Sequence, residues 1–206
     1  MIDLKLSTLT VVNKADRLGR DEPMLWTYFI ELSVATLNSH QFVVVTDPLK
    51  GKLKKAGKGD TVSIPAAVGR YHRTTGRIFA VGVIAAAFDN DLRTQKQIKD
   101  GYAAGAKALN DAILNHFATS GFADPTPEQE EAMGEQIGAA VRRAVIDAHG
   151  GLVALLLLGG GKSLGSDKYF RKLFEDTIDE PVTLNFNAKK DRAIYKVNGS
   201  LKFVRP

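Results

Sequence analysis

The chain has 206 residues, of which 44% are apolar and 25% charged, and this length and composition are typical of a globular protein with one sizeable core. The absence of cysteine excludes disulfides, thiolate metal sites and a cysteine nucleophile. The net charge of +5 favours anionic partners such as lipid head groups, nucleic acid or an acidic protein.

Residues 1–90 have the alternation and turn signals of β structure. In "IDLKLSTLTVV" the apolar positions alternate and then slip by one residue, at Ile2, Leu4, Leu6, Leu9 and Val11. This alternation predicts a strand and differs from the basic region and continuous apolar run of a signal peptide. With no leader expected and no apolar run near the roughly 20 residues of a membrane span, a cytoplasmic location is the default.

Four further segments of this region predict strands. The segment "MLWTYFIELSV" is aromatic and β-branched, as in a half-buried strand, and "HQFVVVTD" is a short apolar run typical of a buried one. "DTVSIPAAV" follows a Gly-Asp turn, and "RIFAVGVIAAAF" is strongly apolar. The spacing of the turns between these segments favours a sandwich or barrel.

Residues 91–149 predict two helices. Apolar residues recur at helical spacing in the first, at Ile98, Tyr102, Leu109, Ile113 and Phe117. The second begins at a capping box from Thr126 to Gln129 and ends at Gly150-Gly151. A short loop joins them, so we expect an antiparallel hairpin, whose small residues suit close packing within it or against a second copy of the chain.

The remaining residues, 163–206, return to β structure, in which Asn198-Gly199 is either a tight hairpin turn or a bulge. The fold class predicted is α+β: one domain over residues 1–206, an antiparallel β-sandwich of about eight strands. The helical hairpin, near residues 92–160, is an insertion between two late strands of this sandwich.

Acidic residues gather in two predicted loops, at Asp16 and Asp21 in the first and at Asp89 and Asp91 in the second. Calcium takes six to eight oxygen ligands, so carboxylates from two loops at one end of a sheet suit it. The alternative is that these side chains stabilise turns and stay solvated. The two loops therefore predict either a calcium site or ordinary polar turns.

Three segments around these loops, "ADRLGRDEPMLWTYF", "VGVIAAAFDNDLRT" and "KSLGSDKYF", resemble parts of C-two domains, the calcium- and phospholipid-binding β-sandwiches. The resemblance implies a C-two-like sandwich with calcium held by Asp16, Asp21, Asp89 and Asp91. Glu22 stands between the acid and the proline of the family pattern, and the helical hairpin separates the second and third segments.

A run of lysines in "PLKGKLKKAGKGD" provides a second candidate site, made of Lys50, Lys52, Lys54, Lys55 and Lys58. Such a cluster attracts anionic lipid or phosphate, at about 1 kcal/mol per lysine near a charged surface. The alternative is a solvated hairpin tip, or lysines that guard an edge strand. No aromatic residue is interleaved, which argues against stacking on single-stranded nucleic acid.

The leading functional prediction is a non-enzymatic binding module that binds calcium at the acidic loops and engages a membrane or a protein partner. A structural or assembly subunit without a metal role is the alternative. A hydrolase of unrecognised type is the third possibility. The Gly-rich stretch "LGGGKSLG" lacks the first glycine of a phosphate loop, where Leu156 stands.

Overall fold

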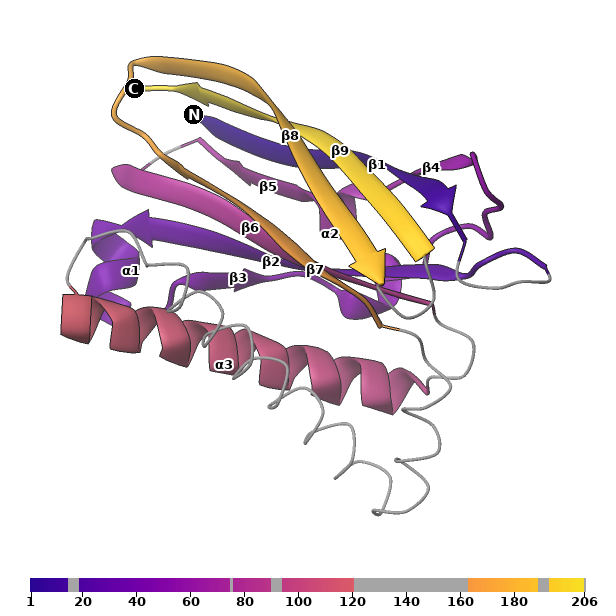
Figure 1. The fold of residues 1–206 in the computed structure, drawn as a ribbon. Coiled ribbons are helices and arrows are strands. Elements are labelled where there is room, and N and C mark those ends of the chain that lie inside the picture. The colour runs from indigo at the N-terminus through magenta and orange to yellow at the C-terminus, as the bar shows by residue number, and fades with distance from the viewer. Residues whose placement is uncertain (15–18, 75, 90–93, 121–162, 189–192, 206) are drawn as a thin grey trace.

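The computed structural model describes residues 1–14, 19–74, 76–89, 94–120, 163–188 and 193–205 (Figure 1). The elements in chain order are β1 (Ile2–Asn13), β2 (Pro23–Ser33), α1 (Val34–Ser39), β3 (Val43–Val45), a 3-10 turn (Pro48–Gly51), β4 (Thr61–Ser63), α2 (Ala66–Gly69), β5 (Arg70–Arg73), β6 (Ile78–Asp89), α3 (Gln95–Ser120), β7 (Ser163–Lys172), β8 (Thr177–Ala188) and β9 (Ala193–Val204).

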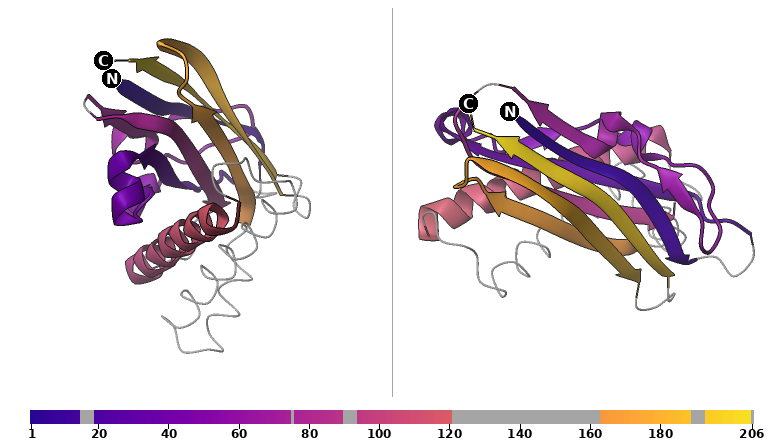
Figure 2. Two further views of the ribbon diagram at one scale, coloured as in Figure 1. Left: turned by 90° about the vertical axis from the view of Figure 1, so that its left-hand side faces the viewer. Right: turned by 90° about the horizontal axis from the view of Figure 1, so that it is seen from above.

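Two antiparallel sheets form the body of the molecule. The first has the order β4-β1-β9-β8, with β5 also paired to β1, and the second has the order β3-β2-β6-β7. The sheets face each other, and α3 lies along the outer side of the second sheet (Figures 1 and 2). The predicted α+β architecture is confirmed at this level, with nine strands in the described residues.

Strand β1 shows why its apolar pattern slips. Ile2, Leu4 and Leu6 face the core, and so do Leu9 and Val11, because the register with β9 shifts between Leu6 and Thr8. Gly199 lies opposite this bulge, and a Cβ there would lie 1.9 Å from the carbonyl oxygen of Lys5. The Asn198-Gly199 pair is therefore part of a bulged ladder and not a hairpin turn.

Strand β2 is buried on both faces, so the prediction of a half-buried strand was wrong. One face, with Leu25 and Phe29, packs in the core between the sheets. The other face packs beneath α3, through residues that include Trp26 and Tyr28. The strand is apolar on both faces over most of its length because a helix covers what would otherwise be a solvated face. Its polar residues are buried as well, namely Thr27, Glu31 and Ser33.

Helix α3 lies in the chain between β6 and β7, where the first helix of the insertion was predicted. Its apolar stripe contacts the second sheet through Ile98, Tyr102, Leu109 and Ile113, with Phe117 partly buried beside them. The predicted second helix lies outside the described residues. Among the helices described, none is long and apolar enough to cross a bilayer.

Strand β3 is a short edge strand, so the prediction that "HQFVVVTD" forms a buried strand was wrong. It pairs with β2 along one edge, and Val45 is 59% exposed. The buried member of this segment is Phe42, which packs beside α3 against Phe117. The sequence pattern predicted the strand but not its place in the sheet.

Candidate functional site

The charged loops lie at one end of the sandwich, and this end is called the rim below. The register of β2 with β6 pairs Pro23 with Asp89, so the start of β2 and the end of β6 lie side by side there. β1 ends and β9 begins at the same end, opposite the chain termini (Figure 1). The ends of the two predicted acidic loops are therefore neighbours.

Asp21 is buried at the rim. Its side chain is inaccessible to solvent, and its Oδ2 accepts a hydrogen bond of 2.6 Å from the hydroxyl of Tyr195, which is also buried. Its backbone exchanges two hydrogen bonds with Ala56. A buried carboxylate needs such partners because water no longer solvates it. Asp21 thus joins the segment before β2 to β9 and to residue 56.

The described residues supply little of the predicted calcium site. Asp16 and Asp91 lie outside them, and for Asp89 only the backbone position is described. Asp21 is engaged by Tyr195, and no group of three acidic or histidine side chains suited to a metal occurs within the described part of the chain. Calcium binding remains a prediction that this part of the rim does not by itself support.

The lysine segment, residues 50–58, is held against β2. Leu53 donates its N–H to the carbonyl of Pro23, and Lys52 forms an isolated bridge with Met24. Gly51 passes so close to β2 that a Cβ there would lie 2.1 Å from the carbonyl oxygen of Leu25. These contacts fix residues 51–53 of the segment against β2.

Glu22 lies opposite two of these lysines. One carboxylate oxygen lies 2.5 Å from Nζ of Lys55, and the other lies 3.3 Å from Nζ of Lys52. Hydrogen bonds from Lys55 and Lys52 lower the pKa of Glu22, against a smaller opposing effect of burial. Glu22 was not among the site residues predicted from the sequence, because nothing in the sequence indicated that residues 22 and 52–55 lie side by side.

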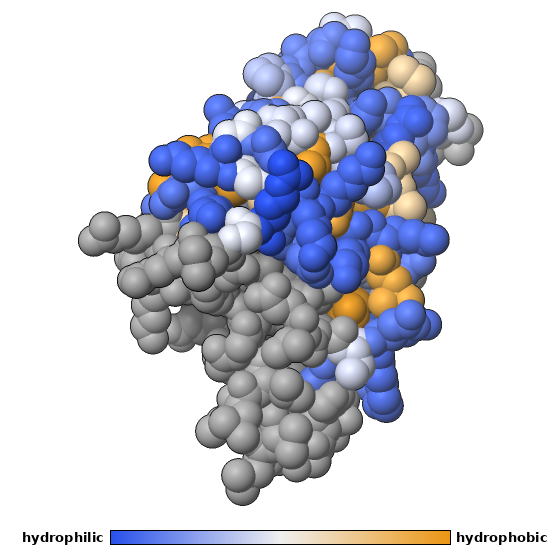
Figure 3. Space-filling model, turned by 90° about the vertical axis from the view of Figure 1, so that its right-hand side faces the viewer, coloured by the Kyte–Doolittle hydropathy of each residue, from blue (hydrophilic) through white to orange (hydrophobic). Residues whose placement is uncertain are grey.

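The other lysines of the segment have no such counter-ion. Lys50, Lys54 and Lys58 are exposed and form no ion pair with any residue that the structure describes. Nearby, Arg20 lies 3.9 Å from Asp60. Figure 3 looks at this end of the molecule, where hydrophilic side chains cover most of the coloured surface. The described rim carries a surplus of positive charge.

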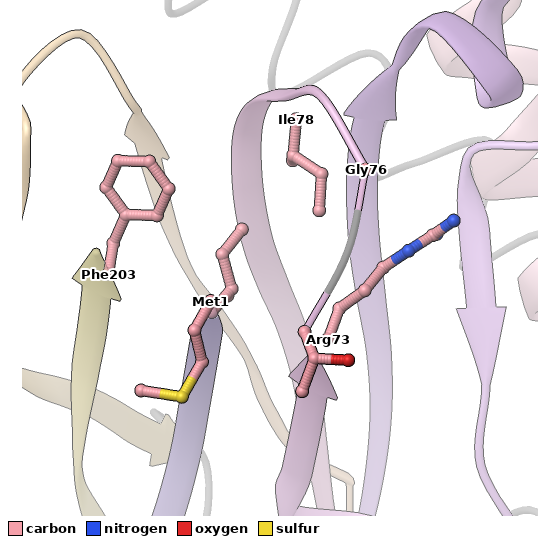
Figure 4. A pocket seen from close by; sticks show the side chains of 7 residues that line it. Met1, Arg73, Gly76, Ile78 and Phe203 are labelled. Atoms are coloured by element: carbon pink, nitrogen blue, oxygen red, sulfur yellow. The ribbon is translucent and has the colours of Figure 1, made fainter. Parts of the chain in front are cut away.

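The opposite end holds a second buried carboxylate. Glu31 is 1% exposed and accepts hydrogen bonds of 2.5 Å from the hydroxyl of Tyr71 and from Nη1 of Arg73. A cavity of about 10 Å³ lies nearby, lined in part by Met1, Arg73 and Phe203 (Figure 4). A volume of this size admits about one water molecule and is too small for a larger ligand. The charged rim at the other end is therefore the candidate site.

No protein-family model matches the chain, and comparison with curated proteins and with solved structures found no significant similarity.

Proposed function

We propose that the protein is a non-enzymatic binding module that attaches to an anionic membrane surface through the lysine segment of its rim. The observation that carries this proposal is a segment tied to the sandwich by the backbone contacts of Lys52 and Leu53 with β2 and of Ala56 with Asp21. In this segment Lys50, Lys54 and Lys58 are exposed and have no acidic partners among the described residues. The β-sandwich is compatible with a C-two-like domain, and that assignment is part of the proposal.

Electrostatic attraction of this kind is cumulative. Each lysine near an anionic bilayer contributes about 1 kcal/mol, and the attraction is limited to roughly 10 Å from the surface at 0.1 M salt. Three lysines together supply about 3 kcal/mol before the entropy cost of attachment. The backbone contacts of the segment lower that cost, because they order part of it before binding.

Co-sedimentation with phosphatidylserine-containing vesicles tests the proposal. We expect binding that falls as salt rises, and a loss of about tenfold or more when Lys50, Lys54 and Lys58 are changed to glutamine. The matched control changes Lys5, Lys107 and Lys202 to glutamine, which alters the net charge equally on β1, α3 and β9. Equal losses in the two variants, or no binding by the wild-type chain, would contradict the proposal.

Calcium is a second candidate ligand, favoured by the Pro23–Asp89 register that brings the ends of both acidic loops together. Isothermal calorimetry with calcium tests it on the whole chain. We expect heat of binding that is lost when Asp89 and Asp91 are changed to asparagine. No heat at millimolar calcium, or the same heat in that variant, would leave the rim as an anion-binding surface alone.

A further inference from the structure

The contact of Glu22 with the lysine segment has the geometry of a bound anion. Each carboxylate oxygen faces one ammonium group, Lys55 at 2.5 Å and Lys52 at 3.3 Å. The side chain of Glu22 is 19% exposed, whereas those of Lys52 and Lys55 are 55% and 67% exposed. Two lysines reachable from solvent thus converge on one carboxylate that belongs to the protein itself.

The backbone holds this arrangement in place. Asp21 and Ala56 exchange two hydrogen bonds on one side of Glu22, and Pro23 accepts one from Leu53 on the other. The carboxylate therefore lies opposite residues 52–55 without a long flexible connection. Its local concentration near the two ammonium groups is high, and any external anion has to compete with it.

We propose that Glu22 is a built-in competitor that occupies the place of an anionic lipid head group between Lys52 and Lys55. The inference rests on the proposed membrane function and specifies its regulation. A weakly charged bilayer meets only the unpaired lysines of the rim. A densely charged bilayer supplies enough anions to displace Glu22 and recruits two further lysines, so attachment depends steeply on the anionic lipid content.

The test compares E22Q with wild type on phosphatidylcholine vesicles of rising phosphatidylserine content. Glutamine keeps the shape of the side chain and removes its charge, so we expect about fivefold tighter binding and half-maximal attachment at a lower anionic lipid content. The control D179N removes a carboxylate that faces Lys202 at 3.2 Å near the other end of the sandwich. We expect D179N to change binding less than twofold.

A third variant traces the gain to the two lysines. We expect E22Q combined with K52Q and K55Q to bind no more tightly than wild type. An unchanged affinity in E22Q, an equal gain in D179N, or a gain that persists in the triple variant would overturn the competitor role. Thermal melting of each variant confirms that the rim remains folded.

Failure of this inference is distinguishable from failure of the proposed function. If wild type binds through Lys50, Lys54 and Lys58 but E22Q binds equally well, the membrane function holds and the competitor role does not. If wild type does not bind and E22Q does, the membrane function of the wild-type chain is overturned, and only the competition of Glu22 with the anionic surface is supported. If neither chain binds vesicles, both are overturned.

Discussion

Glu31 shows how a single residue can depend on its neighbours for its charge. Burial alone would raise the pKa of its carboxyl, since a charge is costly inside a protein. Hydrogen bonds from the side chains of Tyr71, Ser33 and Arg73, together with the charge of Arg73, outweigh that effect and lower the pKa. Glu31 is therefore ionised in the folded protein at neutral pH and stabilises it there.

The change E31Q is expected to lower the free energy of unfolding by about 1–3 kcal/mol at pH 7. Because the folded pKa lies below the unfolded value of 4.5, the contribution of Glu31 is present above that value and is lost as the pH falls through the folded pKa. Urea unfolding of both chains from pH 7 to about pH 3 should show the difference shrink toward acid. A difference that grows toward acid would contradict this account.

For single residues, the sequence predicted correctly those whose burial follows from the pattern within one strand. The alternation in β1 predicted the strand correctly, and its slip between Leu6 and Leu9 coincides with the register shift in the structure, because alternation along one strand records which side chains face the core. Asp21 and Glu22 were different. Their partners, Tyr195 and Lys55, are distant in the chain, and the same acidic turn is compatible with solvent, calcium or buried hydrogen bonds.

Among the elements, α3 contributes a polar group to the second sheet as well as an apolar stripe. The Tyr102 hydroxyl accepts a hydrogen bond of 2.7 Å from the backbone N–H of Thr46 and donates one of 2.6 Å to the carbonyl of Thr27. It stands between these backbone groups of β2 and of the residue that follows β3. The ring stacks on Tyr28 with centroids 4.6 Å apart.

The change Y102F is expected to cost about 1–3 kcal/mol, because it removes the acceptor of the Thr46 N–H and the shorter of the two side-chain hydrogen bonds to the Thr27 carbonyl. Y28F is the matched control, since it keeps the same stacked pair and removes a single hydrogen bond of 3.3 Å to the Tyr102 carbonyl. We expect Y28F to cost less than about 1 kcal/mol. Urea unfolding measures both, and amide exchange at Thr46 should accelerate in Y102F alone.

The sequence predicted the long elements better than the short ones. The apolar stripe of α3 and the runs of β2 and β6 extend over ten residues or more, so their periodicity is clear. The helix α1 and strand β5 were missed because their four to six residues carry no period of their own. The exposure of β3 depends on its place at the edge of the sheet, which local pattern does not record.

For the whole molecule, the sequence predicted two-layered β structure with a helical insertion but not the strand order. The first sheet joins β1 to β9, so the two ends of the chain pair from Ile2 with Phe203 onward. This pairing brings together residues that are separated by nearly the whole chain. A pattern read over a short stretch of sequence therefore does not predict it. The rim depends on that closure, because Tyr195 of β9 reaches Asp21 only when the chain ends are paired.

Within the described residues, three tyrosine–carboxylate hydrogen bonds join the two sheets. Tyr195 binds Asp21 at the rim, Tyr71 binds Glu31 near the opposite end, and Tyr169 of β7 binds Glu180 of β8 at one side. The first two are buried, whereas the Glu180 side chain is 31% exposed. A buried carboxylate loses more when its donor is removed, so the first two bonds should matter most to the alignment of the sheets.

We expect Y195F and Y71F each to lower the free energy of unfolding by about 1.5–3 kcal/mol, and Y169F by less than about 1 kcal/mol. Asp21 and Glu31 are ten residues apart along extended chain, or about 30 Å. The double variant Y195F/Y71F should therefore lose the sum of the single effects within about 0.5 kcal/mol, in one cooperative urea transition. A loss well below the sum would mean that the two hydrogen bonds are energetically coupled. Two separate transitions would mean that the two ends of the sandwich do not unfold as one unit.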